Sequence, residues 1–306
     1  MKTTSLRARR VALAALLLMA MPFARAEKIS VVATTGMVAD LVRGVGGDRV
    51  EVLQLMGSGV DPHQYRPTAG DASRLSKADA IFYNGLNLEA RMGELFERLS
   101  NRGGRVFTVT DSIPRERLIA DKTAAGIYDP HVWLDAGLWA GSVDKVVEGL
   151  SQADPAGKDI YVQNGESLRA RLRELDAWLK ARAGELPADR RVLVTSHDAF
   201  GYFGRSYGFK VVGLQGMSTV SEASLADVSA LSDFLRQSGA RAVFVETSVN
   251  PEAIRRVAEN ADVKIGGELF SDAMGESGDV RGGFDTGTHD GMLRHNMATI
   301  VEGLKP

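Results

Sequence analysis

The stretch 154–184, DPAGKDIYVQNGESLRARLRELDAWLKARAG, separates two halves of the chain and differs from both of them in its pattern of apolar residues. It shows no strand-like alternation, and its large apolar residues recur at helical spacing, so they share one face of a helix. The residues on this face are Tyr161, Leu168, Leu172, Leu175 and Leu179. At 1.5 Å per residue, a single helix here would be roughly 45 Å long, enough to run beside two lobes and join them.

The ends of this stretch carry residues that favour helix termini. Asp154 suits the N-cap, Pro155 the first helical position and Gly184 the position after the last turn. Gly165 costs about 1 kcal/mol in a helix interior, so two shorter helices with a break at Asn164 and Gly165 are the alternative. We predict one continuous, stiff helix.

Each flanking half alternates short apolar runs with amphipathic segments. Stretches 28–35 (KISVVATT) and 191–196 (RVLVTS) have strand character, and stretch 36–47 (GMVADLVRGVGG) has helical character. This alternation predicts an α/β fold of two lobes, each a mostly parallel sheet flanked by helices. We set the lobes at 27–153 and 185–306, with the linker helix at 154–184. A cleft between two such lobes is a favoured place for a ligand.

The first 26 residues have the layout of a secretory signal peptide. Four basic residues in MKTTSLRARR precede the apolar run VALAALLLMAM, and Ala24-Arg25-Ala26 forms a small-x-small cleavage site. The apolar run is shorter than the roughly 20 residues that span a bilayer. We expect cleavage after Ala26 and a periplasmic protein. The chain contains no cysteine, so we expect no lipid anchor, and a metal site would use His, Asp and Glu.

Composition excludes one class of partner. The chain has 306 residues, 44% hydrophobic and 25% charged, with a formal net charge of −2. These are ordinary globular values, and there is no basic excess to drive binding to nucleic acid.

Two of the five histidines follow the same dipeptide. Asp61-Pro62-His63 and Asp129-Pro130-His131 repeat one tripeptide in the first half. Proline restricts both its own backbone and that of the preceding residue, so each histidine leaves a stiffened turn and loses little entropy when it binds a metal. Asp-Pro is also a common turn dipeptide, which is the simpler explanation of either instance alone. The repetition favours a pair of metal ligands.

The third candidate, His197, ends the strand RVLVTS, and His63 lies just beyond the strand VEVLQLM. Ligands of open α/β sheets bind outside the carboxyl ends of strands, so His63, His131 and His197 can reach one cleft. A fourth ligand from the second lobe would be Asp272, which follows the strand VKIGGELF. On composition alone its rivals are Glu268, Glu276 and Asp279.

The remaining histidines are poor partners for one ion. His289 and His295 are separated by six positions on a predicted C-terminal helix and do not share a face. We expect both to be ordinary surface or capping residues.

Several stretches together resemble a known family. They are DPHQYRPT, YDPHVWLD, TSHDAFGYF, VETSVNP, and LFSDAMG followed by GMLRHNMATIVEGL, and they span nearly the whole mature chain in order. The chain resembles the periplasmic solute-binding proteins of ABC importers for manganese, zinc and iron, the metal-binding group with a rigid helical linker.

The resemblance assigns roles to particular residues. It implies that His63, His131, His197 and Asp272 bind one metal ion between the lobes, and it is what raises Asp272 above its rivals. It also places the carboxylate of Glu246 near the site, where it could orient a ligating imidazole.

The choice of metal stays open between two ions. Three imidazoles and one carboxylate suit Zn²⁺, whereas manganese sites more often take carboxylate. The His-rich loop of zinc-dedicated family members is missing before His131, and the third and fourth stretches look most like the mixed manganese and zinc subgroup. We expect Zn²⁺ or Mn²⁺ as cargo, with Fe²⁺ less favoured.

The expected function is capture of one divalent ion in the periplasm by a monomer that delivers it to an ABC permease and ATPase, with no nucleic-acid partner. A metallochaperone or adhesin without its own transporter is the alternative. A zinc-dependent hydrolase is more remote, because the chain has no H-E-x-x-H motif and no G-x-S-x-G elbow. We therefore predict that the protein is not an enzyme.

Overall fold

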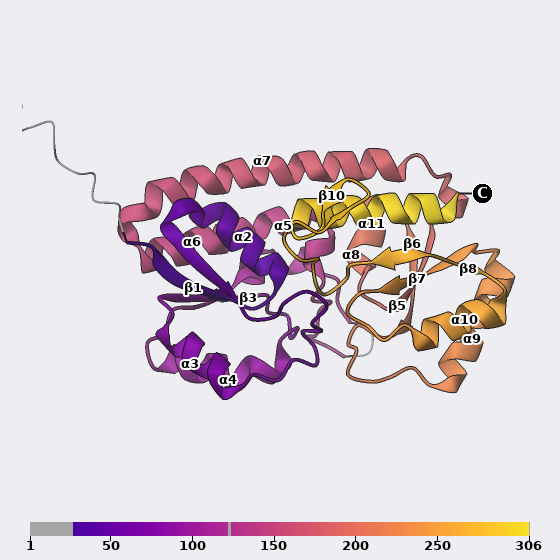
Figure 1. The fold of residues 1–306 in the computed structure, drawn as a ribbon, viewed down its shortest axis with the longest axis horizontal. Coiled ribbons are helices and arrows are strands. Elements are labelled where there is room, and N and C mark those ends of the chain that lie inside the picture. The colour runs from indigo at the N-terminus through magenta and orange to yellow at the C-terminus, as the bar shows by residue number, and fades with distance from the viewer. Residues whose placement is uncertain (1–26, 122–123, 306) are drawn as a thin grey trace, which may run out of the picture.

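Two α/β lobes lie side by side, and one long helix runs along both of them (Figure 1). The computed structural model describes residues 27–121 and 124–305. The predicted signal peptide, residues 1–26, lies outside the described part. No helix within the described residues has the length and apolar character that crossing a membrane requires.

The first lobe is built on a four-stranded parallel sheet in the order β2-β1-β3-β4. Its strands are β1 (Ile29–Ala33), β2 (Val50–Gln54), β3 (Ala80–Tyr83) and β4 (Val106–Thr108). Its helices are α2 (Gly36–Gly46), α3 (Ala69–Lys77), α4 (Gly93–Asn101), α5 (Ala136–Trp139) and α6 (Val143–Ala153). Helices α2 and α6 lie between the sheet and the long helix, and α3 and α4 cover the opposite face (Figure 1).

The second lobe repeats this arrangement. Its strands are β5 (Val192–His197), β6 (Lys210–Gln215), β7 (Ala242–Glu246) and β8 (Lys264–Leu269). The pairs β5-β6 and β7-β8 are parallel, and β5 lies beside β7, so the order in space is β6-β5-β7-β8. Its helices are α8 (Gly201–Tyr207), α9 (Leu225–Ser238), α10 (Glu252–Ala261) and α11 (His289–Leu304), and a small hairpin joins β9 (Val280–Arg281) to β10 (Phe284–Asp285).

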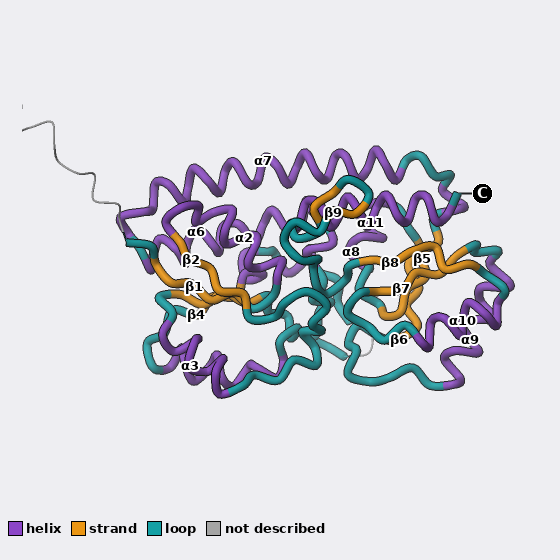
Figure 2. The backbone as a smooth tube through the Cα atoms, viewed as in Figure 1, coloured by secondary structure: helices purple, strands orange, loops and turns teal. Residues whose placement is uncertain are grey.

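Short 3-10 helices occupy many of the connections. They are η1 (Gly47–Arg49), η2 (Ala90–Met92), η3 (Val109–Ser112), η4 (Arg115–Arg117), η5 (Val132–Leu134), η6 (Ala140–Ser142), η7 (Pro155–Gly157) and η8 (Ala188–Arg190). Loops gather in the region between the two sheets (Figure 2). Strands β5 and β7 end there, at His197 and Glu246.

The predicted linker is one helix, α7 (Lys158–Ala183), of 26 residues. The predicted apolar face is buried along its whole length, from Tyr161 to Leu179. Gly165 does not break the helix. It faces α6 at close range, since a Cβ at this position would be 2.7 Å from Val147 Cγ2. The fold class expected from the sequence is confirmed.

The predicted caps of this helix are right in position at its start but differ in detail. Asp154 is the N-cap and Pro155 the first residue of η7, which leads directly into α7. The carboxylate of Asp154 makes no capping bond but accepts hydrogen bonds from Arg49 Nε and the Tyr161 hydroxyl, both at 2.7 Å. The chain therefore enters the helix through η7. At the other end Gly184 has a right-handed φ of −60°, so the left-handed conformation for which glycine is favoured does not occur there.

The lobes share one apolar core. A single buried cluster runs from Val31 and Val38 of the first lobe, through Trp133 and Leu172, to Phe244 of the second. Separation of the lobes would expose this cluster to water, and exposure of apolar surface is unfavourable. The fold thus holds the loops between the sheets in a fixed relation.

Candidate metal centre

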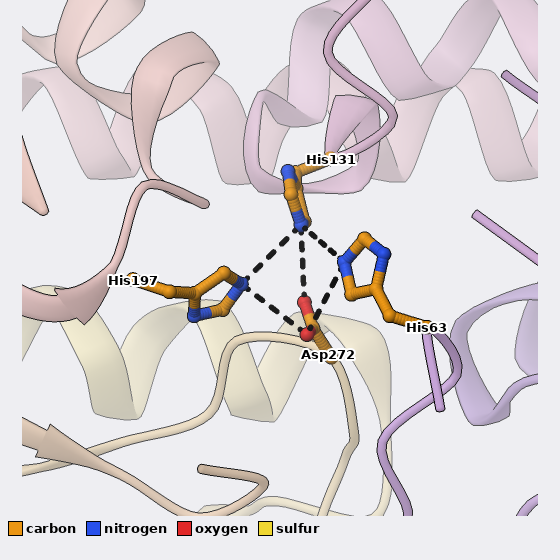
Figure 3. A group of neighbouring side chains, drawn as sticks. All are labelled: His63, His131, His197 and Asp272. Atoms are coloured by element: carbon orange, nitrogen blue, oxygen red, sulfur yellow. Dashed lines mark hydrogen bonds and ion pairs between the residues drawn. The ribbon is translucent and has the colours of Figure 1, made fainter. Parts of the chain in front are cut away.

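Four side chains from separate segments converge between the lobes (Figure 3). His63 lies beyond the end of β2, His131 directly precedes η5, His197 is the last residue of β5, and Asp272 follows β8. All four are buried, with exposed fractions of 5% for His63, 1% for Asp272 and 0% for the other two. The structure thus brings together the three histidines and the aspartate that the sequence analysis selected.

The spacing of their polar atoms matches one small ion. Nε2 of His131 lies 3.3 Å from Nε2 of His63 and 3.4 Å from Nε2 of His197. The Asp272 oxygens lie 3.3 Å from Nε2 of His131, 3.3 Å from Nε2 of His197 and 3.8 Å from Nε2 of His63. The edges of a tetrahedron with zinc–nitrogen bonds of about 2.0–2.1 Å are about 3.3–3.4 Å long. One ion of this size therefore fits among all four groups.

Each of the two Asp-Pro-His turns contains the same kind of hydrogen bond, from the backbone of its histidine to the side chain of its aspartate. The Asp61 Oδ1 accepts the backbone N–H of His63 at 2.8 Å, and the Asp129 Oδ1 accepts that of His131 at 2.9 Å. This bond across two residues closes an Asx-type turn. Proline stiffens the middle of each turn, so the aspartate and the proline together fix the point from which each imidazole leaves the chain.

In two of the imidazoles, a carboxylate contacts Nδ1, the ring nitrogen that faces away from the centre. Nδ1 of His131 lies 2.7 Å from Asp129 Oδ1, and Nδ1 of His197 lies 2.6 Å from Glu246 Oε2. Oε1 of Glu246 in addition accepts the backbone N–H of His197 at 2.9 Å. A carboxylate at Nδ1 keeps the proton there and leaves the Nε2 lone pair for a metal. The contact of Glu246 was expected from the family resemblance. That of Asp129 was not predicted, although the repeated Asp-Pro-His tripeptide placed a carboxylate two residues before each histidine.

Burial and charge act in opposite directions on the imidazoles. Burial lowers the pKa of His63 to about 4, although the Asp272 carboxylate opposes this effect. Burial also disfavours the charged form of His131, but the carboxylates of Asp129 and Asp272 outweigh it and raise the pKa of His131 to about 9. The metal-free centre therefore attracts protons to the positions that a cation would take.

The same balance governs the second-lobe pair. Burial opposes the charged form of His197, yet Glu246 and Asp272 together raise its pKa well above the usual value. Burial likewise opposes ionisation of Asp272, but His197 and His131 hold the pKa of that carboxyl well below its usual range. Asp272 is therefore a buried carboxylate whose oxygens face three imidazole nitrogens and accept no well-aligned hydrogen bond from the described residues. In the metal-free centre, protons on His131 and His197 balance the charge of Asp272 across 3.3 Å, and a bound cation would replace these protons.

The rivals of Asp272 are occupied elsewhere. Glu268 and Asp279 both pair with Arg281, at 2.8 and 2.9 Å, and Glu276 is exposed. These contacts are set by the hairpin β9-β10, whose register the sequence did not indicate.

One histidine expectation was wrong. His289 is 2% exposed rather than a surface residue, and its Nε2 lies 2.8 Å from the carbonyl oxygen of Trp133. The cap of α11 is provided by Thr288 instead, whose hydroxyl accepts the N–H of Gly291. His295 is half-buried, with Nε2 at 3.2 Å from the carbonyl oxygen of Glu268. Neither belongs to the four-residue centre.

Comparison with known proteins identifies the relatives of this chain. The family model described as ZnuA, zinc-uptake complex component A, periplasmic, matches residues 31–303. The chain belongs to the ZnuA family. Members of this family are periplasmic or extracellular solute-binding proteins rather than enzymes, and they work with the permease and ATPase of an ABC transporter.

Individual ZnuA-family relatives align over almost their whole length. The zinc-binding protein TroA of Treponema pallidum is 47% identical over 280 residues, which cover 90% of this chain and 88% of TroA. The manganese-binding lipoprotein MntA of Bacillus subtilis is 42% identical over 284 residues, covering 91% and 90%. The solved structure of periplasmic zinc-binding TroA superposes with a TM-score of 0.86 at 44% identity, covering 91% of this chain and 100% of that one.

Proposed function

We propose that this ZnuA-family protein captures one divalent transition-metal ion, Zn²⁺ or Mn²⁺, and delivers it to an ABC importer. His63, His131, His197 and Asp272 would be its ligands, and Glu246 and Asp129 would orient two of the imidazoles. One observation carries the proposal: four buried donor groups have the mutual spacing of a coordination shell, and the carboxylate among them has no other hydrogen-bond partner in the described part of the chain.

The donor set favours zinc over manganese in a binding experiment. Three imidazoles with one carboxylate suit Zn²⁺, and the intrinsic order of affinities places Zn²⁺ above Mn²⁺. The relatives are named for both ions, zinc for TroA and manganese for MntA. The cargo in the cell therefore depends on metal supply as well as on the site.

A transport role also fits the closed shape of the centre. The two lobes together supply four donor residues around one buried point, whereas a catalytic zinc keeps a coordination position open for water. We propose that the protein does not catalyse a reaction, acts as a monomer and meets its permease after export directed by residues 1–26. We further propose 27–153, 154–184 and 185–306 as the first lobe, the linker and the second lobe.

The test is metal stoichiometry. The protein should be purified from its native periplasm without added metal, and its zinc, manganese and iron measured by elemental analysis. We expect close to one ion per chain. A chelator should remove this ion, and re-addition of Zn²⁺ should restore the same stoichiometry. His131→Ala should lose most of the bound ion, while His295→Ala, which lies outside the centre, should keep it. Equal metal content in both variants would contradict the proposed ligand set.

A further inference from the structure

His63 is held less firmly than the other two imidazoles. Its Nε2 lies 3.8 Å from Asp272, whereas His131 and His197 each lie 3.3 Å from an oxygen of that carboxylate. Among the described residues, no carboxylate lies within ion-pair distance of His63 Nδ1, while carboxylates hold the other two rings at this atom. At 5% exposure it is also the most exposed of the four. Its position therefore depends on the turn that carries it.

That turn is anchored across the cleft. Asp61 Oδ1 accepts the backbone N–H of His63, and its other oxygen, Oδ2, accepts the hydroxyl of Thr219 at 2.5 Å. Oδ2 also accepts the side-chain amide of Gln64 at 2.9 Å. Thr219 belongs to the second lobe, in the loop 216–224 between β6 and α9. One carboxylate thus ties the backbone of a first-lobe histidine to a side chain of the second lobe.

The two Asp-Pro-His turns differ at this point. In the second turn, Oδ1 of Asp129 serves both the backbone and the ring of His131. In the first turn, the described contacts of Asp61 include none with the ring of His63, and the aspartate reaches the second lobe instead. The same tripeptide therefore fixes one imidazole within its own lobe and the other through a contact between lobes.

Thr219 lies at the border between the centre and solvent. It is 4% exposed, although its neighbour Val220 is 54% exposed. Val220 and Met217 of the same loop line a cavity of about 410 Å³ that also borders His63. Because His63 is the most exposed of the four side chains, an ion that leaves the centre would pass between His63 and this loop.

We propose that Asp61 and Thr219 form a latch between the lobes that holds His63 in its ligating position and slows release of the bound ion. The proposal rests on the metal-binding function proposed above. When the Thr219 hydroxyl leaves Asp61, the only described hydrogen bond that still joins the turn of His63 to the loop 216–224 is the long one from Gln64 Nε2 to the carbonyl oxygen of Thr219, at 3.4 Å. His63 can then move away, while His131 and His197 stay held by their carboxylates. Asp61 and Thr219 are positioning residues and do not touch the ion.

The experiment measures the rate of metal release. Wild type and variants of the full mature chain are loaded with one equivalent of Zn²⁺ and mixed in a stopped-flow instrument with excess fluorescent zinc chelator. Thr219→Val removes the hydroxyl at nearly constant volume, and we expect release to become about ten- to a hundredfold faster, because the lost hydrogen bond has a charged acceptor. Thr219→Ser keeps a hydroxyl and should release zinc close to the wild-type rate. Ser221→Ala, at an exposed position of the same loop, is the control and should leave the rate unchanged.

Three outcomes separate the possibilities. Release from Thr219→Val at the wild-type rate would overturn the latch. If this variant in addition melts at a lower temperature without metal, the Thr219 hydroxyl has a purely structural role. Asp61→Asn, which weakens the same contact at its other end, provides a second variant if Thr219→Val does not fold, and its release should also be faster. If wild type retains no zinc at all, the proposed function fails rather than the latch alone.

Discussion

At the residue scale, the imidazoles are held by carboxylates in two different ways. Asp129 is a sequence neighbour of His131, whereas Glu246 comes from the adjacent strand β7 and reaches His197 across the sheet. Both arrangements fix the ring and its tautomer before an ion arrives. Preorganisation of this kind increases affinity because less freedom is lost on binding.

The contact of Glu246 can be tested by a change that keeps its size. In Glu246→Gln an amide can donate to Nδ1 of His197, which favours the tautomer with its proton on Nε2, facing the ion. We expect zinc affinity to fall about ten- to a hundredfold, as is usual when such an outer partner is lost. Competition with a chelator of known affinity measures this change. Glu276→Gln, at an exposed position outside the centre, should bind zinc as wild type does, and equal losses in the two variants would contradict the role of Glu246.

The shifted pKa values predict how binding depends on pH. With a pKa of about 9, His131 carries a proton at pH 7 that the ion must displace, whereas His63, with a pKa of about 4, is already neutral. Zinc affinity should therefore increase as pH rises toward 9. It should decrease on acidification, most steeply as pH approaches 4, where His63 also takes up a proton. At pH 7, binding should release protons. Calorimetric titration with zinc in two buffers of different ionisation enthalpy measures them, and identical heats in both buffers would contradict the prediction.

The sequence indicated the candidate residues better than their partners. The repeated Asp-Pro-His and the strand end at His197 singled out three side chains by local pattern. Asp272 could not be separated from Glu268 or Asp279 by composition, because what distinguishes them is the contact of those two with Arg281. The hydrogen bond between Asp61 and Thr219 joins residues far apart in the chain, so the sequence around either residue could not predict it.

At the element scale, the long helix α7 depends on one close approach. Gly165 faces α6, where a Cβ would lie 2.7 Å from Val147 Cγ2 and 3.2 Å from Val143 Cγ1. Valine side chains are stiff, so they cannot easily turn aside. The sequence predicted the helix from its apolar face but explained Gly165 only as a cost, because the partner surface on α6 is not visible in the pattern.

A pair of glycine substitutions tests this explanation. Gly165→Ala should lower the free energy of unfolding by about 1–3 kcal/mol through overpacking, even though alanine is the better helix former by about 1 kcal/mol. Gly93→Ala, at the exposed start of α4 with no atom within 4 Å of the added Cβ, should not destabilise the protein. Urea denaturation of the metal-free proteins measures both. If Gly165→Ala is as stable as Gly93→Ala, the close approach of α6 does not explain the glycine.

Helix ends were harder to predict than helix interiors. The buried apolar face of α7 followed from the helical spacing of its residues alone. The Asp154 carboxylate, in contrast, accepts a hydrogen bond from Arg49, more than a hundred positions earlier in the chain. A long-range ion pair of this kind overrides the local preference of aspartate for an N-cap. His289 shows the same effect, since its expected surface position became a buried one when α11 packed against the segment of Trp133.

At the scale of the whole molecule, the lobes are connected by more than the linker. The hydroxyl of Tyr202 in the second lobe donates to the carbonyl oxygen of Asp129 at 2.8 Å and accepts the N–H of Ile119 at 3.0 Å. The indole of Trp133 donates to the carbonyl oxygen of Ser271 at 2.8 Å. These bonds lie beside the shared apolar core, so a wide rotation would break them and expose buried surface.

This connection predicts a small change of shape when the ion binds. Opening of the cleft should be confined to the loops that carry His63 and Thr219, because the bonds of Tyr202 and Trp133 hold the rest of the interface. Small-angle scattering with and without zinc should give closely similar radii of gyration. Tyr202→Phe, which removes both hydroxyl contacts but keeps the ring, should make the metal-dependent change larger. A large compaction of the wild-type protein on zinc binding would instead show that the lobes move as hinged bodies, and the shared core would then have to separate in the metal-free state.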